Sequence, residues 1–252
     1  MSAILVYQKR LSVPRSGGLY SLSIELPSLS LSIDNLYLCS MHKIRIDIIS
    51  DVVCPWCYLG KARLEKAIAL AGDKFEIGMY WYPYELNPEM PLSGMPFKEY
   101  LNQKFGEGEK IQNMIANLTE LGKEAGIEFN FDQITHIPNT FEAHRLLFLA
   151  AGKPEQHLLS TQLFEAYFTR GEEIGATDYL AKMALDLDVP AKVIGEFTNS
   201  DRGKKEILTL EQDYRGSGIN AVPTYIFDQK FIVQGAQTTE VFLQIFDKLA
   251  SQ

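Results

Sequence analysis

The chain of 252 residues is long enough for one large domain or two small ones, and 46% of its residues are hydrophobic, as in globular proteins. Its net charge of −8, without any run rich in lysine or arginine, argues against a nucleic-acid partner. No apolar run approaches the ~18 residues that a membrane helix needs, and three cysteines are too few for a disulfide scaffold.

Residues 1–40 differ in composition from the rest, because they contain nine of the fifteen serines. We expect an N-terminal extension here, either an unpacked tail or a misassigned start before Met41. The alternating pattern leaves an extra β-ribbon as the other interpretation. The segment also lacks the apolar core of a signal peptide, so we expect a cytoplasmic protein. Cys39 belongs to this segment and is assigned no catalytic role.

Residues 43–72 predict a strand that is followed by a helix. The first half alternates apolar and polar residues, with isoleucine at Ile44, Ile46 and Ile48. The second half has apolar residues at helical spacing, namely Leu64, Ala67, Ile68 and Ala71. Gly72 supplies a stop, and Pro55 fits the first helical turn, so Cys54 lies at or next to the N-cap.

This position predicts redox chemistry for the Cys-x-x-Cys motif. The free N–H groups and the positive end of the helix dipole should favour the thiolate of Cys54, which makes it a nucleophile. Cys57, one turn later on the same side, can attack the sulfur of Cys54 and resolve a mixed disulfide. Pro55 and Trp56, between the two cysteines, help to set the reactivity of the pair.

Two other interpretations of the motif are less favoured. A zinc site needs two more ligands, usually as a second close pair, and the remaining cysteine and the histidines are scattered. A purely structural disulfide would close almost no loop and would stabilise little. Redox chemistry is therefore favoured, and we expect neither a metal nor a cofactor.

The remainder of the chain predicts a strand-containing part that a helical part interrupts. Residues 75–84 read as a second strand, which would be parallel to the first. Residues 97–197 show helical periodicity without a strand. A helix over 200–215, a strand over 222–227, another over 231–233 and a final helix capped by Thr238 or Thr239 complete the chain. The predicted domains are 41–85 with 199–252, and the helical insertion 86–198.

This order of elements resembles the thioredoxin fold, an α/β fold with a mixed sheet flanked by helices. The helical insertion makes it similar to the DsbA-like family. Three segments, 50–61 (SDVVCPWCYLGK), 139–146 (NTFEAHRL) and 218–227 (GINAVPTYIF), resemble the FrnE branch of that family. The resemblance covers about residues 44–249.

The resemblance implies roles for individual residues. Cys54 matches an exposed nucleophilic cysteine, and Cys57 matches a buried resolving cysteine. Pro223 matches a cis-proline that faces the pair and leaves the backbone of Val222 free to bind an extended peptide. With Trp56 and Pro55, these two residues are the candidate substrate contacts. His144, in the second segment, could tune the thiolate or could be a packing residue.

We expect a thiol–disulfide oxidoreductase or isomerase acting on protein or small-thiol disulfides, with glutathione as a possible partner. An alternative is a glutathione-dependent transferase or isomerase of small aromatic molecules, similar to kappa-class and hydroxychromene-carboxylate isomerase enzymes. Those relatives generally have serine in place of the catalytic cysteine. A third possibility is a redox-regulated binding module without turnover.

Overall fold

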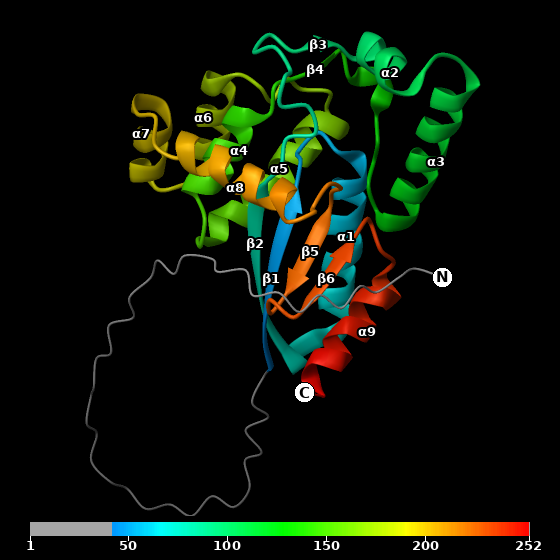
Figure 1. Ribbon diagram of the computed structural model, residues 1–252, viewed down its shortest axis with the longest axis vertical. Helices are drawn as coiled ribbons and strands as arrows, with labels where there is room; N and C mark the ends of the chain where they lie inside the picture. Colours follow the sequence, from blue (N-terminus) through cyan, green and yellow to red (C-terminus); the bar gives the residue numbers. More distant parts are fainter. Residues whose placement is uncertain (1–41, 252) are drawn as a thin grey trace, which may run out of the picture.

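The computed structural model describes residues 42–251 (Figure 1). The expectations about residues 1–40, and about Cys39 within them, lie outside this range. A four-stranded sheet in the order β2-β1-β5-β6 forms the centre, and helices pack on both of its faces. Its strands are β1 (His42–Ser50), β2 (Phe75–Pro83), β5 (Thr224–Phe227) and β6 (Phe231–Gln234).

The first half of the sheet is the predicted parallel βαβ unit. Ile46 of β1 pairs with Met79 of β2, and the register continues in parallel along both strands. Helix α1 (Pro55–Ala71) connects the two strands and is followed by a short 3-10 turn, η1 (Gly72–Lys74). The helix ends at Gly72, whose φ of 60° lies in the left-handed region that favours glycine.

The C-terminal part of the chain completes the same sheet. β5 runs antiparallel to β1, and β6 forms the predicted hairpin with β5. Asp228 and Gln229 make the turn with positive φ angles of 48° and 58°. Helix α9 (Thr239–Ala250) begins after Thr238, as predicted, and packs against α1.

Side-chain alternation explains why both faces of the sheet are covered. Ile48 of β1 and Tyr225 of β5 point into the larger core, which α1 and α9 also line. Ile49 and Ile226 point to the opposite face, where Tyr214 of α8 packs against them. Because successive residues of a strand face opposite sides, Ile48 and Ile49 pack into two different cores.

A long, mainly helical segment lies between β2 and β5. Figure 1 shows its helices gathered at the end of the sheet to which the carboxyl end of β1 points. They are α2 (Phe97–Phe105), α3 (Glu109–Ala125), η2 (Phe131–Gln133), α4 (Phe141–Leu149), α5 (Pro154–Phe168), α6 (Thr177–Asp186), α7 (Ala191–Asn199) and α8 (Lys204–Gly216). Since the cysteine motif follows β1, the segment faces that motif.

Two expectations about this segment are corrected. It is not free of strands, because β3 (Met95–Pro96) and β4 (His136–Ile137) form an antiparallel ladder. Two-residue strands are too short to produce a period-two pattern, so the sequence did not reveal them. Helix α8 begins at Lys204 rather than residue 200, because Gly203 at its N-cap adopts a φ of 89°.

Within residues 42–251, no helix combines the length and the apolar character required to cross a membrane.

Candidate active site

The two cysteines of the motif lie at the start of α1, as predicted. Cys54 is the N-cap residue, with an extended backbone (φ −93°, ψ 113°), and Pro55 occupies the first turn. The carbonyl of Cys54 accepts hydrogen bonds from the N–H groups of Cys57 at 3.0 Å and Tyr58 at 3.3 Å. The backbone therefore places Cys54 at the N-terminal end of the helix, where unpaired N–H groups favour an anion.

Both cysteines are buried, which corrects the expectation of an exposed Cys54. The exposed fraction is 4% for Cys54 and 1% for Cys57, and both are free thiols. Cys54 is covered because the loop that precedes β5 lies against it, with the carbonyl oxygen of Val222 at 3.9 Å from its Sγ. Trp56, at 38%, is instead the exposed side chain of the motif.

The surroundings of Cys57 favour its neutral form. Burial raises the pKa of the Cys57 thiol well above its ordinary value, and contact with Cys54 acts in the same direction. The Ser50 side chain and the backbone of Asp51 oppose this rise but do not outweigh it. Cys57 therefore remains a thiol at neutral pH until a reaction step changes its surroundings.

The sheet brings the candidate substrate contacts to the cysteines. The Val222–Pro223 peptide bond is cis, as the resemblance implied. Thr224, the next residue, pairs with Ile49 near the end of β1, so the loop meets the motif through strand pairing. Within this site, Val222 lies beside Cys54 and Pro223 lies beside Gly60 of α1, whereas the Trp56 side chain is partly exposed to solvent.

Tyr225, on β5, is a buried residue of the site that no sequence pattern marked as functional. Its hydroxyl has no hydrogen-bond partner, and a Cβ added to Gly60 of α1 would clash with it. Burial raises the pKa of Tyr225 well above its ordinary value, and the charges of Cys57 and Cys54 act in the same direction. A glycine at position 60 therefore lets the hydroxyl reach the first turns of α1 near the two sulfurs.

A buried ion pair lies next to the motif. Nε2 of His144, on α4, is 3.3 Å from Oδ1 of Asp51, which precedes α1. The Oδ2 atom of Asp51 accepts a hydrogen bond from the N–H group of Leu86 at 2.7 Å. The exposed fraction is 0% for Asp51 and 2% for His144, so the pair is shielded from water. Asp51 follows an apolar strand directly, and only this position could have drawn attention to it.

Two more carboxylates lie close to this pair. Glu85 is buried, and its backbone N–H donates to Oε1 of Glu211, on α8, at 2.8 Å. Burial raises the pKa of Glu85 to about 7, although the charge of His144 opposes that rise. Arg215 donates to the carbonyl oxygen of Glu85 at 2.6 Å and lies 3.7 Å from Glu211.

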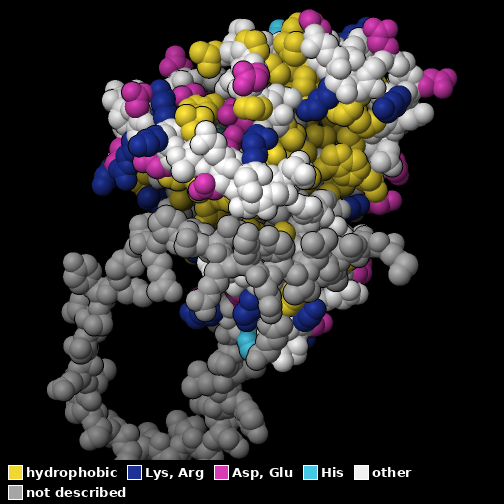
Figure 2. All heavy atoms as spheres, in the orientation of Figure 1, with side chains coloured by type: hydrophobic (Ala, Val, Ile, Leu, Met, Phe, Trp, Pro, Cys, Tyr) yellow, Lys and Arg dark blue, Asp and Glu magenta, His cyan; other side chains and the backbone are white. Residues whose placement is uncertain are grey.

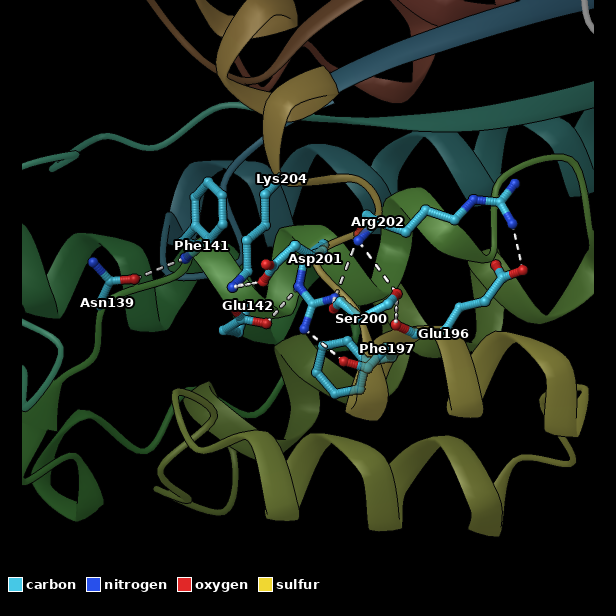
Figure 3. A network of polar contacts seen from close by, with 10 residues as sticks. Asn139, Phe141, Glu142, Glu196, Phe197, Ser200, Asp201, Arg202 and Lys204 are labelled. Atoms are coloured by element: carbon cyan, nitrogen blue, oxygen red, sulfur yellow. Dashed lines mark hydrogen bonds and ion pairs between the residues drawn. The ribbon is translucent and has the colours of Figure 1, made fainter.

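The other residues singled out near His144 lie away from the cysteines. Asn139 donates to the carbonyl oxygen of Met90 at 2.8 Å and accepts from the N–H of Phe141 at 3.0 Å. Arg145 reaches the last turn of α7, where it donates to the carbonyl oxygen of Phe197 at 2.6 Å (Figure 3). Of Asn139, His144 and Arg145, only His144 contacts the cysteine segment.

Comparisons with known proteins agree with this fold. The sequence model of the family described as DSBA-like thioredoxin domain matches residues 45–247. The uncharacterized protein YwbO of Bacillus subtilis is 28% identical over 204 residues, which cover 79% of this chain and 94% of that protein.

Solved structures include similar chains. A probable DsbA oxidoreductase from Streptomyces coelicolor is 27% identical, with a TM-score of 0.74, and the match covers 83% of this chain and 91% of that one. The cytosolic disulfide reductase DsbM from Pseudomonas aeruginosa, solved with GSH, is 15% identical, with a TM-score of 0.54 over 82% of this chain and 96% of that one. The DsbM similarity concerns the fold alone.

Proposed function

Because the chain belongs to the DSBA-like thioredoxin domain family, we propose that it is a thiol–disulfide oxidoreductase with Cys54 as the nucleophile and Cys57 as the resolving cysteine. The thiolate of Cys54 attacks one sulfur of a substrate disulfide, and the other substrate sulfur leaves as a thiolate. Cys57 then attacks Sγ of Cys54 while its proton passes to the departing substrate sulfur, so an internal disulfide forms and the second substrate thiol is released.

The observation that carries this proposal is the difference between the surroundings of the two sulfurs. Cys54 is at the N-cap of α1, where the helix favours an anion, and burial raises the pKa of Cys57. The sulfur of Cys54 is thus suited to attack first, and the sulfur of Cys57 stays protonated until the second step. Such an order of events is required for a mixed disulfide to form before it is resolved.

The substrate would bind along the loop before β5. The carbonyl oxygen of Val222 is 3.9 Å from Sγ of Cys54, so an extended segment lying beside Val222 would bring its disulfide to the nucleophile. Pro55 and Trp56 directly follow Cys54 at the start of α1 and Trp56 is partly exposed, so we place both among the contacts of this segment. Figure 2 shows hydrophobic side chains gathered between α1 and α3 on the face in view, which suits a peptide with apolar side chains.

Small thiols are the second class of substrate in this proposal. The DsbM structure was solved with GSH, and glutathione carries the thiol that could return the couple to its reduced form. We place the protein in the cytoplasm, where thiols are kept reduced and a Cys-x-x-Cys pair can cycle. The direction of net electron transfer depends on the potential of the couple against that compartment.

The alternative of an aromatic-substrate isomerase or transferase receives no support from the aromatic strand β2. Trp81 is buried against α5, with its Nε1 3.3 Å from Nδ1 of His157, and Tyr82 packs edge-on against Tyr214. These rings therefore contribute to packing. A second thiol also has no role in such chemistry.

The Cys57→Ser variant tests the proposed function. We expect it to accumulate mixed disulfides with proteins, detected as higher-mass species that a reductant removes, while the unaltered chain reduces insulin. Cys39→Ser is the matched control and should retain insulin reduction and trap nothing. Glutathione conjugation without protein-disulfide turnover would indicate the alternative enzyme, and the absence of both activities would indicate a binding module.

A further inference from the structure

The buried pair His144–Asp51 is joined to both cysteines through the segment that carries Asp51. The backbone N–H of Cys54 donates to the carbonyl oxygen of Asp51 at 3.1 Å. The backbone of Asp51 also acts on the sulfur of Cys57, where it opposes the rise in pKa. Asp51 therefore accepts a hydrogen bond from the N–H group of Cys54 through its carbonyl oxygen, and it contacts His144 through its carboxylate.

The charges that face His144 come from three other parts of the chain. Asp51 lies before α1, Glu85 follows β2, and Glu211 is on α8. Arg215, also on α8, donates to the carbonyl oxygen of Glu85 and lies 3.7 Å from the carboxylate of Glu211. Burial alone would lower the pKa of His144, but contact with Asp51 and the charges of Glu211 and Glu85 outweigh it and raise the pKa. On α4 itself, the neighbouring Arg145 points away to Glu142 and Phe197.

The contact between His144 and Asp51 is an ion pair rather than a well-formed hydrogen bond. Their atoms are 3.3 Å apart, yet Nε2 has no partner at hydrogen-bond geometry. The carboxylate of Asp51 is meanwhile held by the N–H of Leu86. An ion pair of this kind acts through charge at short range, and its effect is strong because both side chains are buried.

We propose that His144 is a positioning residue that sets the reactivity of Cys54, because its positive charge offsets the Asp51 carboxylate attached to the cysteine segment. This inference deepens the proposed function, since it concerns the same two sulfurs. When His144 is charged, the negative charge of Asp51 is compensated and the thiolate of Cys54 forms more readily. When that charge is removed, the buried carboxylate opposes a second negative charge nearby.

The test is the alkylation rate of Cys54 in the full reduced chain, measured with iodoacetamide and peptide-resolved mass spectrometry that separates Cys54 from Cys57 and Cys39. We expect His144→Gln to slow alkylation at pH 7 by about three- to tenfold and to move the midpoint of its pH profile to higher pH. The double variant His144→Gln with Asp51→Asn should return the rate to within about twofold of the unaltered chain, since the uncompensated charge is gone.

His136→Gln is the matched control, because His136 faces Glu173 at 3.2 Å in another, exposed ion pair. It should leave the rate unchanged. An unchanged rate in folded His144→Gln, or a slow rate that the double variant does not restore, would overturn the inference. If His144→Gln does not fold, Asp51→Asn alone decides: faster alkylation supports the inference, and an unchanged rate overturns it.

This measurement is independent of the test of the proposed function. Alkylation needs no protein substrate. If the unaltered chain does not reduce insulin, the proposed function is overturned, and the alkylation result still stands. Conversely, normal insulin reduction together with an unaltered rate in His144→Gln would overturn only the role of His144.

Discussion

His144 and Arg145, neighbours on α4, belong to two buried polar regions that differ in how completely their polar atoms are hydrogen-bonded. Arg145 is paired on every side: with Glu142 at 2.6 Å, with the carbonyl oxygen of Phe197 at 2.6 Å and with that of Ser200 at 3.1 Å (Figure 3). His144 instead lies at the cysteine segment, where several buried polar atoms have no hydrogen-bond partner. They are Ser50 Oγ, Glu85 Oε1, His144 Nε2 and Tyr225 Oη.

The difference separates a structural role from a functional one. Buried polar groups are nearly always paired, so a group without a protein partner points to a redox or catalytic role or to a bound water or ion. Four of the five such atoms among the described residues belong to the cysteine site or the carboxylate cluster beside it. We infer that the Arg145 network holds α4 in place, and that the incompletely paired region serves the chemistry of the cysteines.

The largest effect is expected from breaking the paired region. Arg145→Ala should lower the free energy of unfolding by about 3–5 kcal/mol, because it leaves buried carbonyl groups and Glu142 without their cation. Chemical denaturation followed by circular dichroism measures the change. Arg170→Ala, which removes a half-exposed guanidinium paired with Glu172, should change the same quantity by less than about 1 kcal/mol. Equal losses in the two variants would contradict the comparison.

A smaller effect, dependent on pH, is expected from Glu85. Its pKa rises from an ordinary 4.5 to about 7 in the folded protein, so folding takes up a proton between these values. The associated stability is fully present below about pH 4.5 and is lost as the pH rises through about 7, a decrease of at most about 3 kcal/mol. Glu85→Gln should remove this slope.

Denaturation midpoints between pH 4.5 and 8 provide the measurement for Glu85. Glu173→Gln, at an exposed carboxylate, is the control and should keep the slope of the unaltered chain. A Glu85→Gln profile parallel to that of the unaltered chain would show that Glu85 titrates normally.

The smallest effects on stability are expected at two adjacent residues of β5, Thr224 and Tyr225. Thr224→Val removes a buried hydroxyl that donates to the carbonyl oxygen of Ala221 at 2.7 Å, and should lower the free energy of unfolding by about 1 kcal/mol. Tyr225→Phe removes a buried hydroxyl without a partner, and should be neutral or stabilising. Denaturation of both variants under one set of conditions gives the comparison. A larger loss for Tyr225→Phe would mean that its hydroxyl is paired in solution.

The sequence was sufficient for the features that depend on residues close together in the chain. Alternating isoleucines predicted β1, helical spacing predicted α1, and Pro55 placed Cys54 at the N-cap. The short strands β3 and β4 were missed because each pairs through only two residues. The division into domains and the substrate contacts at Trp56, Pro55 and Val222 remain predictions.

Sequence alone thus determined the order of the elements and the place of both cysteines at the start of a helix, because periodicity, proline and glycine act over a few residues. Only the tertiary structure decided that Cys54 is buried under Val222, that His144 faces Asp51 and that Tyr225 reaches over Gly60. These contacts join residues far apart in the chain. They depend on how β1 pairs with β5 and on where α4 packs, which no local pattern encodes.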